Sequence, residues 1–323
     1  MKRCTATVLA LVLGTLCALA PAAAQEWPSK PARIIVPFGA GSTPDVVARL
    51  VADGLQKQTG QTFIVENKPG ASGNTGTEAV AKAAPDGTTI GLSIGGPLAI
   101  NTLLFANLPY DPKKDISFIT MLVTQPSALA INSSLNVNSV PELVELLRKN
   151  PGKYNFGSIG TGSLSHLAME AIALKSGTKL VHVPYASSPQ AVTALMRNEV
   201  QMVCLPAISI TPQLNSGAIK LLAISTAQRS VLLPGVPTLK ESGIDVEADA
   251  WNGLIGPAGL PEAMIDRINH LVREAITSPT VRQKLSAQLM EPIPDTPADF
   301  RARVDAEISR WKPVIDAAKI QLK

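Results

Sequence analysis

Residues 33–44 read Arg33-Ile34-Ile35-Val36-Pro37-Phe38-Gly39-Ala40-Gly41-Ser42-Thr43-Pro44, a β-branched run followed by a glycine-rich turn and the start of a helix. Thr43 is expected to cap this helix, with Pro44 in its first turn, and apolar residues then recur at helical spacing until Gly60. A strand, a loop and a helix in this order are the unit of parallel sheets with right-handed crossovers. The stretch therefore predicts an α/β fold.

The same order of elements continues along the chain and then restarts. We expect further strands at 63–65, 88–93, 128–131, 154–158, 180–183, 200–204 and 221–225, and helices at 78–84, from 139, at 165–176, and from 188, 261, 279 and 297. In the second half, another glycine loop, Ile159-Gly160-Thr161-Gly162-Ser163, stands between a strand and a helix. Two tandem units of this kind predict two lobes, each with its own sheet.

The first residues have the pattern of a secretory signal peptide. Lys2 and Arg3 precede an apolar run from Val8 to Ala20, and small residues follow up to Ala24. The apolar run is shorter than the about 20 residues that span a hydrocarbon core. We predict cleavage after Ala24 and export to the periplasm; the alternatives are an uncleaved anchor, a buried first helix or a lipid anchor at Cys17.

Composition narrows the class of protein further. The formal charge of +4 falls to +2 once Lys2 and Arg3 are removed, so we expect no nucleic-acid partner and no polybasic membrane patch. Only Cys204 remains in the mature chain, which excludes an internal disulfide. Aromatic residues make up 4% of the chain, which argues against stacking on a sugar or caging a quaternary amine.

The two glycine loops, Gly39 to Ser42 and Gly160 to Ser163, share one physical design. Each lies between the end of a strand and the start of a helix, where glycine lets the backbone approach a ligand and the helix N-terminus favours an anion. Hydroxyl donors in these loops are Ser42, Thr43, Thr161, Ser163 and Ser165. Two facing loops would form a carboxylate clamp. The alternative is structural, because a turn of this type needs glycine and a capping serine or threonine in any case.

Enzymatic readings fit these loops less well. The first loop has Pro44 where a dinucleotide-binding fingerprint needs its third glycine. The segment Gly162-Ser163-Leu164-Ser165-His166 lacks the last glycine of a nucleophile elbow. His166, His182 and His270 are not spaced as metal ligands. We therefore expect no catalysis, no metal and no cofactor, with His166 in a hydrogen-bonding or packing role; an exported hydrolase is the alternative.

Eight segments form a series across nearly the whole mature chain. They are WPSKP at 27–31, VPFGAGSTPD at 36–45, VENKPGASGNTG at 65–76, APDG at 84–87, LPYDP at 108–112, GSLSHLA at 162–168, VHVPY at 181–185 and LPGVPT at 233–238. In content and order, the series resembles the solute receptors of tripartite tricarboxylate transporters, the TctC-like or Bug family.

The resemblance implies a two-lobed type II periplasmic-binding-protein fold with a ligand cleft between the lobes. We assign residues 25–122 and 226–323 to lobe 1 and residues 123–225 to lobe 2, with hinges near Met121–Thr124 and Ser225–Thr226. Such a receptor, expected to be a monomer, captures a dicarboxylate, tricarboxylate or aromatic acid and delivers it to membrane permease subunits. A ligand-sensing receptor that acts through a membrane sensor is the alternative.

The resemblance also implies which residues lie at the cleft. They are Phe38, Gly39, Ala40, Gly41, Ser42, Thr43 and Asp45 in the first loop, Ser93, Gly95 and Gly96 after a strand, Gly160, Thr161, Gly162, Ser163, Ser165 and His166 in the second loop, and Tyr185, Leu205 and Trp251. Asp45 is expected to fix the first loop or its helix start, since it would repel an anionic ligand.

Three positions depart from the pattern of the family. Leu205 stands where many relatives have an acidic residue, Pro97-Leu98 where they have Thr-His, and Ala186-Ser187 where they have a basic residue and glycine. These departures predict a more apolar distal wall that lacks a partner for an ammonium group. An amino acid is therefore a poorer expected ligand than a carboxylate with an apolar or aromatic body.

Overall fold

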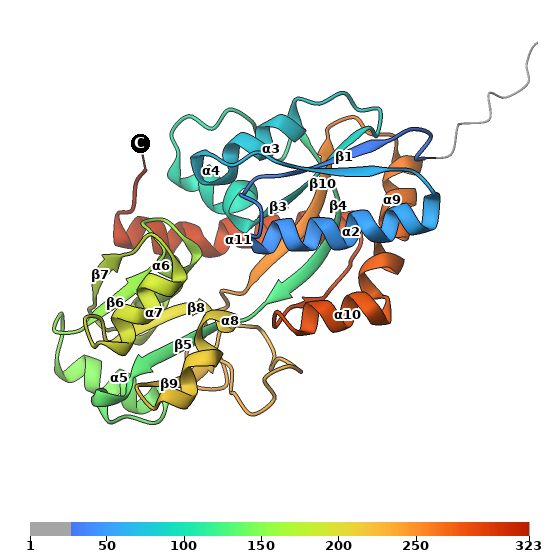
Figure 1. Cartoon of the computed structure of the whole chain (residues 1–323). Helices are drawn as coiled ribbons and strands as arrows, with labels where there is room; N and C mark the ends of the chain where they lie inside the picture. The colour runs from blue at the N-terminus through green and yellow to red at the C-terminus, as the bar shows by residue number, and fades with distance from the viewer. Residues whose placement is uncertain (1–26, 323) are drawn as a thin grey trace, which may run out of the picture.

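The structure, a computed structural model, describes residues 27–322 and consists of two α/β lobes, each built around one sheet (Figure 1). The predicted signal peptide and the cleavage after Ala24 lie outside the described residues. Among the described helices, none is both long and apolar enough to span a membrane.

The sheet of lobe 1 has six strands in the order β11-β4-β10-β3-β1-β2. These strands are β1 (Ala32–Val36), β2 (Phe63–Asn67), β3 (Thr89–Ile94), β4 (Ile116–Gln125), β10 (Ala250–Pro257) and β11 (Glu291–Pro292). β1 is parallel to β2 and β3, as the alternating pattern predicts, but β10 is antiparallel to both of its neighbours. The sheet is therefore mixed. Its strand β10 comes from a distant part of the chain, so no short crossover sets its direction.

The sheet of lobe 2 has five strands in the order β7-β6-β8-β5-β9. These strands are β5 (Ser127–Asn132), β6 (Asn155–Ser158), β7 (Val181–Pro184), β8 (Met202–Pro206) and β9 (Ile219–Ile224). β6 is parallel to β7 and β8, whereas β5 is antiparallel to β8 and β9. In each lobe, the strand by which the chain enters from the other lobe, β10 or β5, lies between two other strands of the sheet and is antiparallel to both.

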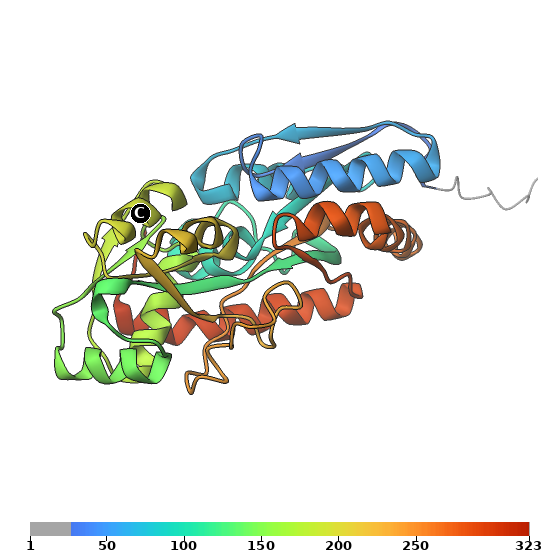
Figure 2. The ribbon, with the colours of Figure 1, turned by 60° about the horizontal axis from the view of Figure 1, so that its bottom comes forward.

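Helices cover both faces of each sheet. They are α2 (Thr43–Thr59), α3 (Asn74–Ala81), α4 (Asn101–Leu104), α5 (Val140–Lys149), α6 (Leu164–Ser176), α7 (Ser188–Met196), α8 (Ala207–Ile210), α9 (Glu262–Thr277), α10 (Pro279–Ser286) and α11 (Pro297–Ala318), with short turns η1 (Ala71–Gly73), η2 (Gly96–Ile100), η3 (Ser133–Leu135) and η4 (Thr211–Ser216). α2 and α9 pack tightly, because a Cβ added at Gly54 would lie 2.5 Å from the Cβ of Ala275. α11 runs along both lobes and contacts β4 in one and α6 in the other (Figure 2).

The apolar core is continuous across the lobes on the α11 side. One buried cluster joins Leu129 and Phe156 of lobe 2 to Ile100 and Leu104 from the η2–α4 segment of lobe 1, and it also contains Trp311 of α11. The other face of the lobe 1 sheet has its own cluster beneath α2 and α9. The C-terminal helix therefore supports both lobes.

The chain crosses between the lobes at two places that differ from the predicted hinges. β4 ends at Gln125 and β5 begins at Ser127, directly after the predicted Met121–Thr124. The return comes at about residues 247–250. Residues 226–248, predicted in lobe 1, lie against lobe 2, because the N–H of Leu239 donates to the carbonyl of Ile224 in β9 at 2.8 Å and the N–H of Ala248 donates to the carbonyl of Ser225 at 2.9 Å. The remaining lobe boundaries stay a prediction.

Candidate functional site

A cavity of about 500 Å³ lies between the two lobes. Lobe 1 lines it with Phe38, Thr43, Pro44, Ser72, Ile94, Gly95, Gly96, Ile100 and Asn101; lobe 2 with residues 159–165, Cys204 and Pro206; the two crossings with Gln125, Ser127, Asp249, Ala250, Trp251 and Asn252; and the C-terminal segment with Glu307 and Leu322. Both glycine loops contribute to the wall. No lysine, arginine or histidine is among these described lining residues.

The first loop, residues 37–42, leads from β1 into α2. Ser42 is the N-cap of α2, in an extended conformation, so the helix is capped one residue before the predicted Thr43. The Ser42 side chain makes no capping hydrogen bond, and its Oγ is buried without a partner among the described residues. Gly41 has φ of 81°, a left-handed conformation that glycine adopts without strain. The loop thus presents a helix N-terminus with an unused hydroxyl.

A buried carboxylate holds the first loop in place. Asp45 Oδ2 accepts from the backbone N–H of Gly41 at 2.9 Å, and Arg49 donates to both Asp45 oxygens. Asn67 donates to Asp45 Oδ1 and to the carbonyl oxygen of Phe38, each at 2.9 Å. Burial alone would raise the pKa of Asp45, but the bonds from Arg49, Gly41 and Asn67 together hold that pKa below its usual value. Asp45 therefore fixes the loop as an anion.

The second loop, residues 159–163, leads from β6 into α6 and is held by neutral groups. Ser165 Oγ accepts from the N–H of Ile159 at 3.0 Å, and Ser158 Oγ accepts from the N–H of Gly160 at 3.1 Å. Ser163 caps α6, accepting from the N–H of His166 at 3.3 Å while donating to the carbonyl of Gly160 at 2.7 Å. Hydroxyls thus do in this loop what a carboxylate does in the first.

Two stacked imidazoles support the second loop from below. The rings of His166 and His182 lie 3.7 Å apart at an interplanar angle of 10°. His166 Nδ1 accepts from the N–H of Gly162 at 3.1 Å, and His182 Nε2 lies 2.6 Å from Ser158 Oγ. Burial, followed by the neighbouring His166, lowers the pKa of His182 to about 4. His182 is therefore neutral at neutral pH, and an unprotonated His166 Nδ1 is what the Gly162 bond requires.

The contact of Ser158 with His182 has the geometry of a nucleophile and its base, which is the one arrangement here that the hydrolase alternative could use. However, Ser158 is fully buried, and no hydrogen bond to Nδ1 of His182 is present among the described residues. Among residues 27–322, no three or more histidine, cysteine, aspartate or glutamate side chains are grouped so that they could hold a metal ion. The pair supports the loop, because Ser158 Oγ, in contact with His182, also accepts from the N–H of Gly160 at 3.1 Å.

The structure brings together about half of the predicted site residues. Those that line the cavity are Phe38, Thr43, Gly95, Gly96, Gly160, Thr161, Gly162, Ser163, Ser165 and Trp251. Those that do not are Gly39, Ala40, Gly41, Ser42, Asp45, Ser93, His166, Tyr185 and Leu205. Contact with a ligand stays a prediction for all of them.

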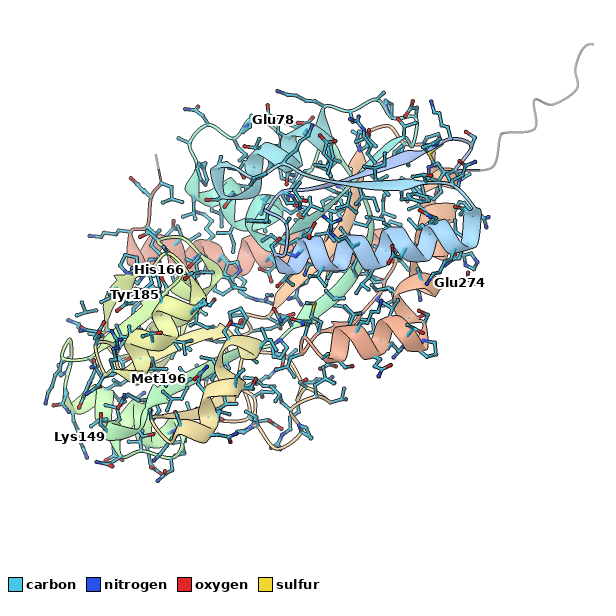
Figure 3. The ribbon with its side chains drawn as sticks, in the orientation of Figure 1. Glu78, Lys149, His166, Tyr185, Met196 and Glu274 are labelled. Atoms are coloured by element: carbon cyan, nitrogen blue, oxygen red, sulfur yellow. The ribbon has the colours of Figure 1, made fainter. Side chains whose placement is uncertain are left out.

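The residues outside the cavity wall have identifiable structural positions. Leu205 is fully buried in a core cluster on the face of β8 opposite the cavity, whereas its neighbours Cys204 and Pro206 line the cavity. The expectation of an apolar distal wall built on Leu205 therefore loses its basis. Ser93 is buried in a contact with Thr77 at 3.0 Å between the oxygens. Tyr185 packs against the cluster that contains Leu205, and Figure 3 labels it, like His166, on lobe 2.

Sequence reasoning missed the wall formed by the crossings and α11. Gln125, Asp249, Asn252 and Glu307 line the cavity, yet none was a candidate. β4 and β10, which carry or adjoin the first three, were not predicted as strands. The available signal was the apolar run at 116–123 that ends in polar residues, which is how a buried strand reaches a polar cavity.

Comparisons with known proteins agree on one family. A family model described as tripartite tricarboxylate transporter family receptor, TctC, matches residues 47–320. The protein BugT of Bordetella pertussis is 33% identical over 318 residues, covering 98% of both chains. A structure of an R. palustris protein with adipate has a TM-score of 0.78 at 32% identity and covers 92% of this chain and 99% of its own. That of MatC from Rhodopseudomonas palustris with bound malate has a TM-score of 0.73 at 29% identity, covering 90% and 100%.

Proposed function

The chain belongs to the tripartite tricarboxylate transporter receptor family, and we propose that it holds a small organic carboxylate in the cavity between its two glycine loops. The observation that carries the proposal is the meeting of two helix N-termini, those of α2 and α6, at one cavity of about 500 Å³. Backbone N–H groups and the helix dipole favour an anion at each terminus. The family is one of solute-binding receptors, so capture followed by release is the expected activity.

The chemistry of the wall supports an anion held by neutral donors. Thr161 is exposed in the second loop, and no hydrogen bond from its N–H or hydroxyl occurs among the described residues. Several such donors are needed, since one helix terminus contributes only about 0.3–1 kcal/mol at an exposed site. Relatives solved with adipate and with malate carry ligands of this chemical class. A clamp without cationic side chains suits a ligand that must be released to a partner.

A thermal-shift screen of the protein from Gln25 onward tests the proposal. The panel contains dicarboxylates, tricarboxylates, aromatic acids, amino acids and sugars. A ligand at about 100 times its Kd adds roughly 2.7 kcal/mol to the free energy of unfolding, which raises Tm clearly. We expect the rise with carboxylates.

Two substitutions of exposed threonines make the screen specific to the site. Thr161→Leu, in the cavity wall, should abolish the shift, whereas Thr193→Leu, on an exposed face of α7, should leave it intact. A shift that survives in Thr161→Leu, or a shift with sugars alone, contradicts the carboxylate clamp.

The finer parts of the function rest on the family. We propose that residues 1–24 direct export and are removed after Ala24, that the mature receptor works as a monomer in the periplasm, and that it delivers its ligand to the permease subunits of a tripartite transporter. N-terminal sequencing of the exported protein tests the first point. Loss of uptake of the bound acid when the gene for this chain is deleted tests the last.

A further inference from the structure

Four side chains form one wall of the cavity where the chain crosses between the lobes. Gln125 ends β4, Asp249 and Asn252 lie at the start of β10, and Glu307 projects from α11. We call these four residues the hinge wall. Each is at least nine-tenths buried, with exposed fractions of 2%, 7%, 3% and 2%, respectively.

The amide residues of the hinge wall have side-chain oxygens that can accept hydrogen bonds. Asn252 Oδ1 is buried and has no hydrogen-bond donor among the described residues. The Nε2 group of Gln125 donates to the carbonyl of Gln288 at 2.8 Å, which leaves its amide oxygen as the end without a donor. A buried acceptor without a partner costs about 1–3 kcal/mol, so a ligand that supplies a donor gains correspondingly.

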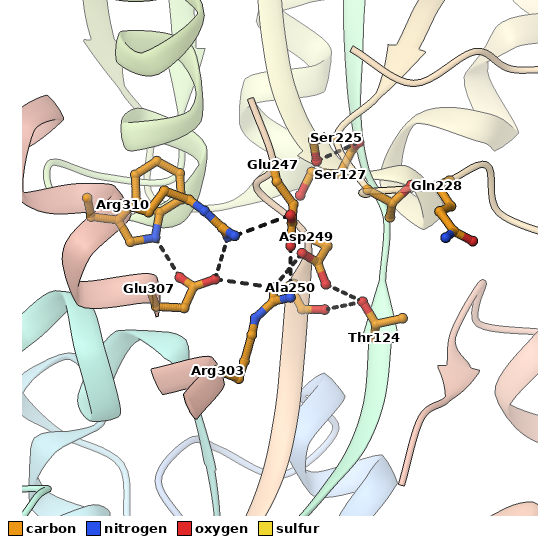
Figure 4. A network of polar contacts seen from close by, with 12 residues as sticks. Thr124, Ser127, Ser225, Gln228, Glu247, Asp249, Ala250, Arg303, Glu307 and Arg310 are labelled. Atoms are coloured by element: carbon orange, nitrogen blue, oxygen red, sulfur yellow. Dashed lines mark hydrogen bonds and ion pairs between the residues drawn. The ribbon is translucent and has the colours of Figure 1, made fainter. Parts of the chain in front are cut away.

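The two carboxylates of the hinge wall belong to a cluster in which acidic side chains outnumber basic ones. Arg303 contacts Glu247 at 2.8 Å, Asp249 at 2.7 Å and Glu307 at 3.2 Å, and Arg310 contacts Glu247 and Glu307 (Figure 4). Two arginines thus face three carboxylates in this part of the described chain. Burial raises the pKa of Glu307, while Arg303, Arg310 and the indole N–H of Trp311 act to lower it.

A second carboxylate on the ligand would meet this wall unfavourably. It would lose its hydration next to Asp249 and Glu307, and no cationic side chain lines the described cavity to replace that hydration. A hydroxyl group at the same place would donate to Asn252 or Gln125 at no cost in charge. A water molecule could hydrate the second carboxylate only where the wall leaves space for that water and offers it hydrogen-bond partners.

We propose that the ligand carries its carboxylate at the glycine loops and, at its far end, an uncharged hydrogen-bond donor that the hinge wall recognises. This inference rests on the proposed function and narrows it to hydroxy acids and related monocarboxylates. Asp249 and Asn252 are its specificity-determining residues. Asp249 excludes the second negative charge, and Asn252 accepts from the donor.

Matched acids test the inference by calorimetric titration of the mature protein at neutral pH. One series contains hexanoate, 6-hydroxyhexanoate and adipate, and a shorter series contains butanoate, 4-hydroxybutanoate and succinate. Within the series that binds, we expect the hydroxy acid to bind about tenfold tighter than both the plain acid and the diacid, as one well-paired hydrogen bond would give.

Three variants assign the effect to residues. Asn252→Leu should remove the preference for the hydroxy acid over the plain acid. Asp249→Asn should raise the affinity for the diacid about tenfold relative to the plain acid. Glu247→Gln removes the same unit of charge from the arginine cluster at a side chain that does not line the cavity, and should change that ratio far less. Circular dichroism and Tm confirm that each variant is folded before it is titrated.

The outcomes separate this inference from the proposed function. A diacid that binds as tightly as the hydroxy acid, or tighter, overturns the inference and leaves the carboxylate clamp in place. A hydroxy-acid preference that persists in Asn252→Leu also overturns it, because the wall would then not be the group that recognises the donor. If no acid of either series binds and the wider screen yields no carboxylate, the proposed function and the inference fall together.

Discussion

The two ligand loops have the same backbone plan but are held by opposite kinds of chemistry. In the first loop, one ionised carboxylate, Asp45, collects donors from Gly41, Arg49 and Asn67. In the second, serine hydroxyls and the stacked rings of His166 and His182 hold the loop. Similar βα loops can thus be fixed by charge or without it, and the consequences differ in stability and in pH dependence.

The difference has a physical cause in what surrounds each loop. Asp45 lies under a helix N-terminus whose dipole favours a negative charge, and the side chain of Arg49 reaches it from the solvent side, where it is 53% exposed. The second loop lies on the stacked rings of His166 and His182 above Phe156, an environment that penalises charge. Paired substitutions, one in each loop or one at each partner of a contact, test whether the two loops differ in this way.

The largest effect is expected at Asp45. Asp45→Ala removes the buried carboxylate that accepts from the N–H of Gly41, from Arg49 and from Asn67, of which Asn67 keeps only the carbonyl of Phe38, and should lower the free energy of unfolding by about 2–4 kcal/mol. Urea denaturation measures the change. The matched control is Arg49→Ala, which removes the half-exposed partner of the same ion pair and should cost much less, because solvent screens an exposed arginine. Equal costs would mean that the carboxylate does not hold the loop.

A second effect separates the loops by pH. The pKa of His182 is depressed to about 4, so the unfolded chain takes up a proton near pH 6.5 that the folded chain refuses. Stability from this group is complete above about pH 6.5 and is lost as the pH falls towards about 4. Since the ring is partly exposed, we expect a loss of about 1–2 kcal/mol rather than the full value of the shift.

The stability contribution of Asp45 is lost at a lower pH than that of His182. Its pKa is lowered, so its contribution is present above the ordinary value of 3.8 and is lost only as the pH falls through the lower folded value. Asp45 therefore adds no slope between neutral pH and about pH 5, whereas the second loop does through His182; Asp295 and Glu307, whose pKa values are raised by burial, add slopes of their own. His182→Gln should change the slope that melting curves show in this range, and the exposed His270→Gln should not. An unchanged slope in His182→Gln would assign the pH dependence to another group.

The two loops also show which features of the site can be predicted from the sequence. Both were identified from glycine, hydroxyl residues and the change from strand to helix, because these signals are local. The role expected for Asp45 came from the family resemblance, and the structure shows its bonds to the first loop. The histidine pair was not predicted as a pair, since His166 and His182 belong to different elements and meet only through the parallel pairing of β6 with β7.

The hinge wall shows where sequence reasoning fails. Gln125 and Asn252 lie 127 positions apart and become neighbours through the pairing of β4 with β10, in which Asn252 is opposite Val123. Antiparallel pairing of distant strands leaves no local periodicity that identifies the partner. Leu205 was misplaced for a related reason. A shift of one residue along a strand moves a side chain to the other face of the sheet, and Cys204 and Pro206 face the cavity instead.

The smallest effect concerns the two capping serines, Ser42 and Ser163. Ser163 accepts from the N–H of His166, so Ser163→Ala should cost about 1 kcal/mol of stability, the usual value of an N-cap. Ser42 makes no such bond, and its buried Oγ has no partner among the described residues, so Ser42→Ala should change the free energy of unfolding by less than about 0.5 kcal/mol. Urea denaturation of both variants measures the difference directly.

The same pair tests why the first loop keeps a hydroxyl that does nothing for its fold. If Ser42 Oγ serves the ligand, Ser42→Ala should weaken carboxylate binding while leaving the ligand-free protein as stable as before. Ser163→Ala should do the opposite. It should lower the free energy of unfolding by the value of the lost cap, and it should lower ligand affinity only as far as the weakened loop requires. Equal loss of stability in both variants would mean that both serines cap their helices. The contrast between Ser163, which caps α6, and Ser42, which makes no capping bond, would then not hold.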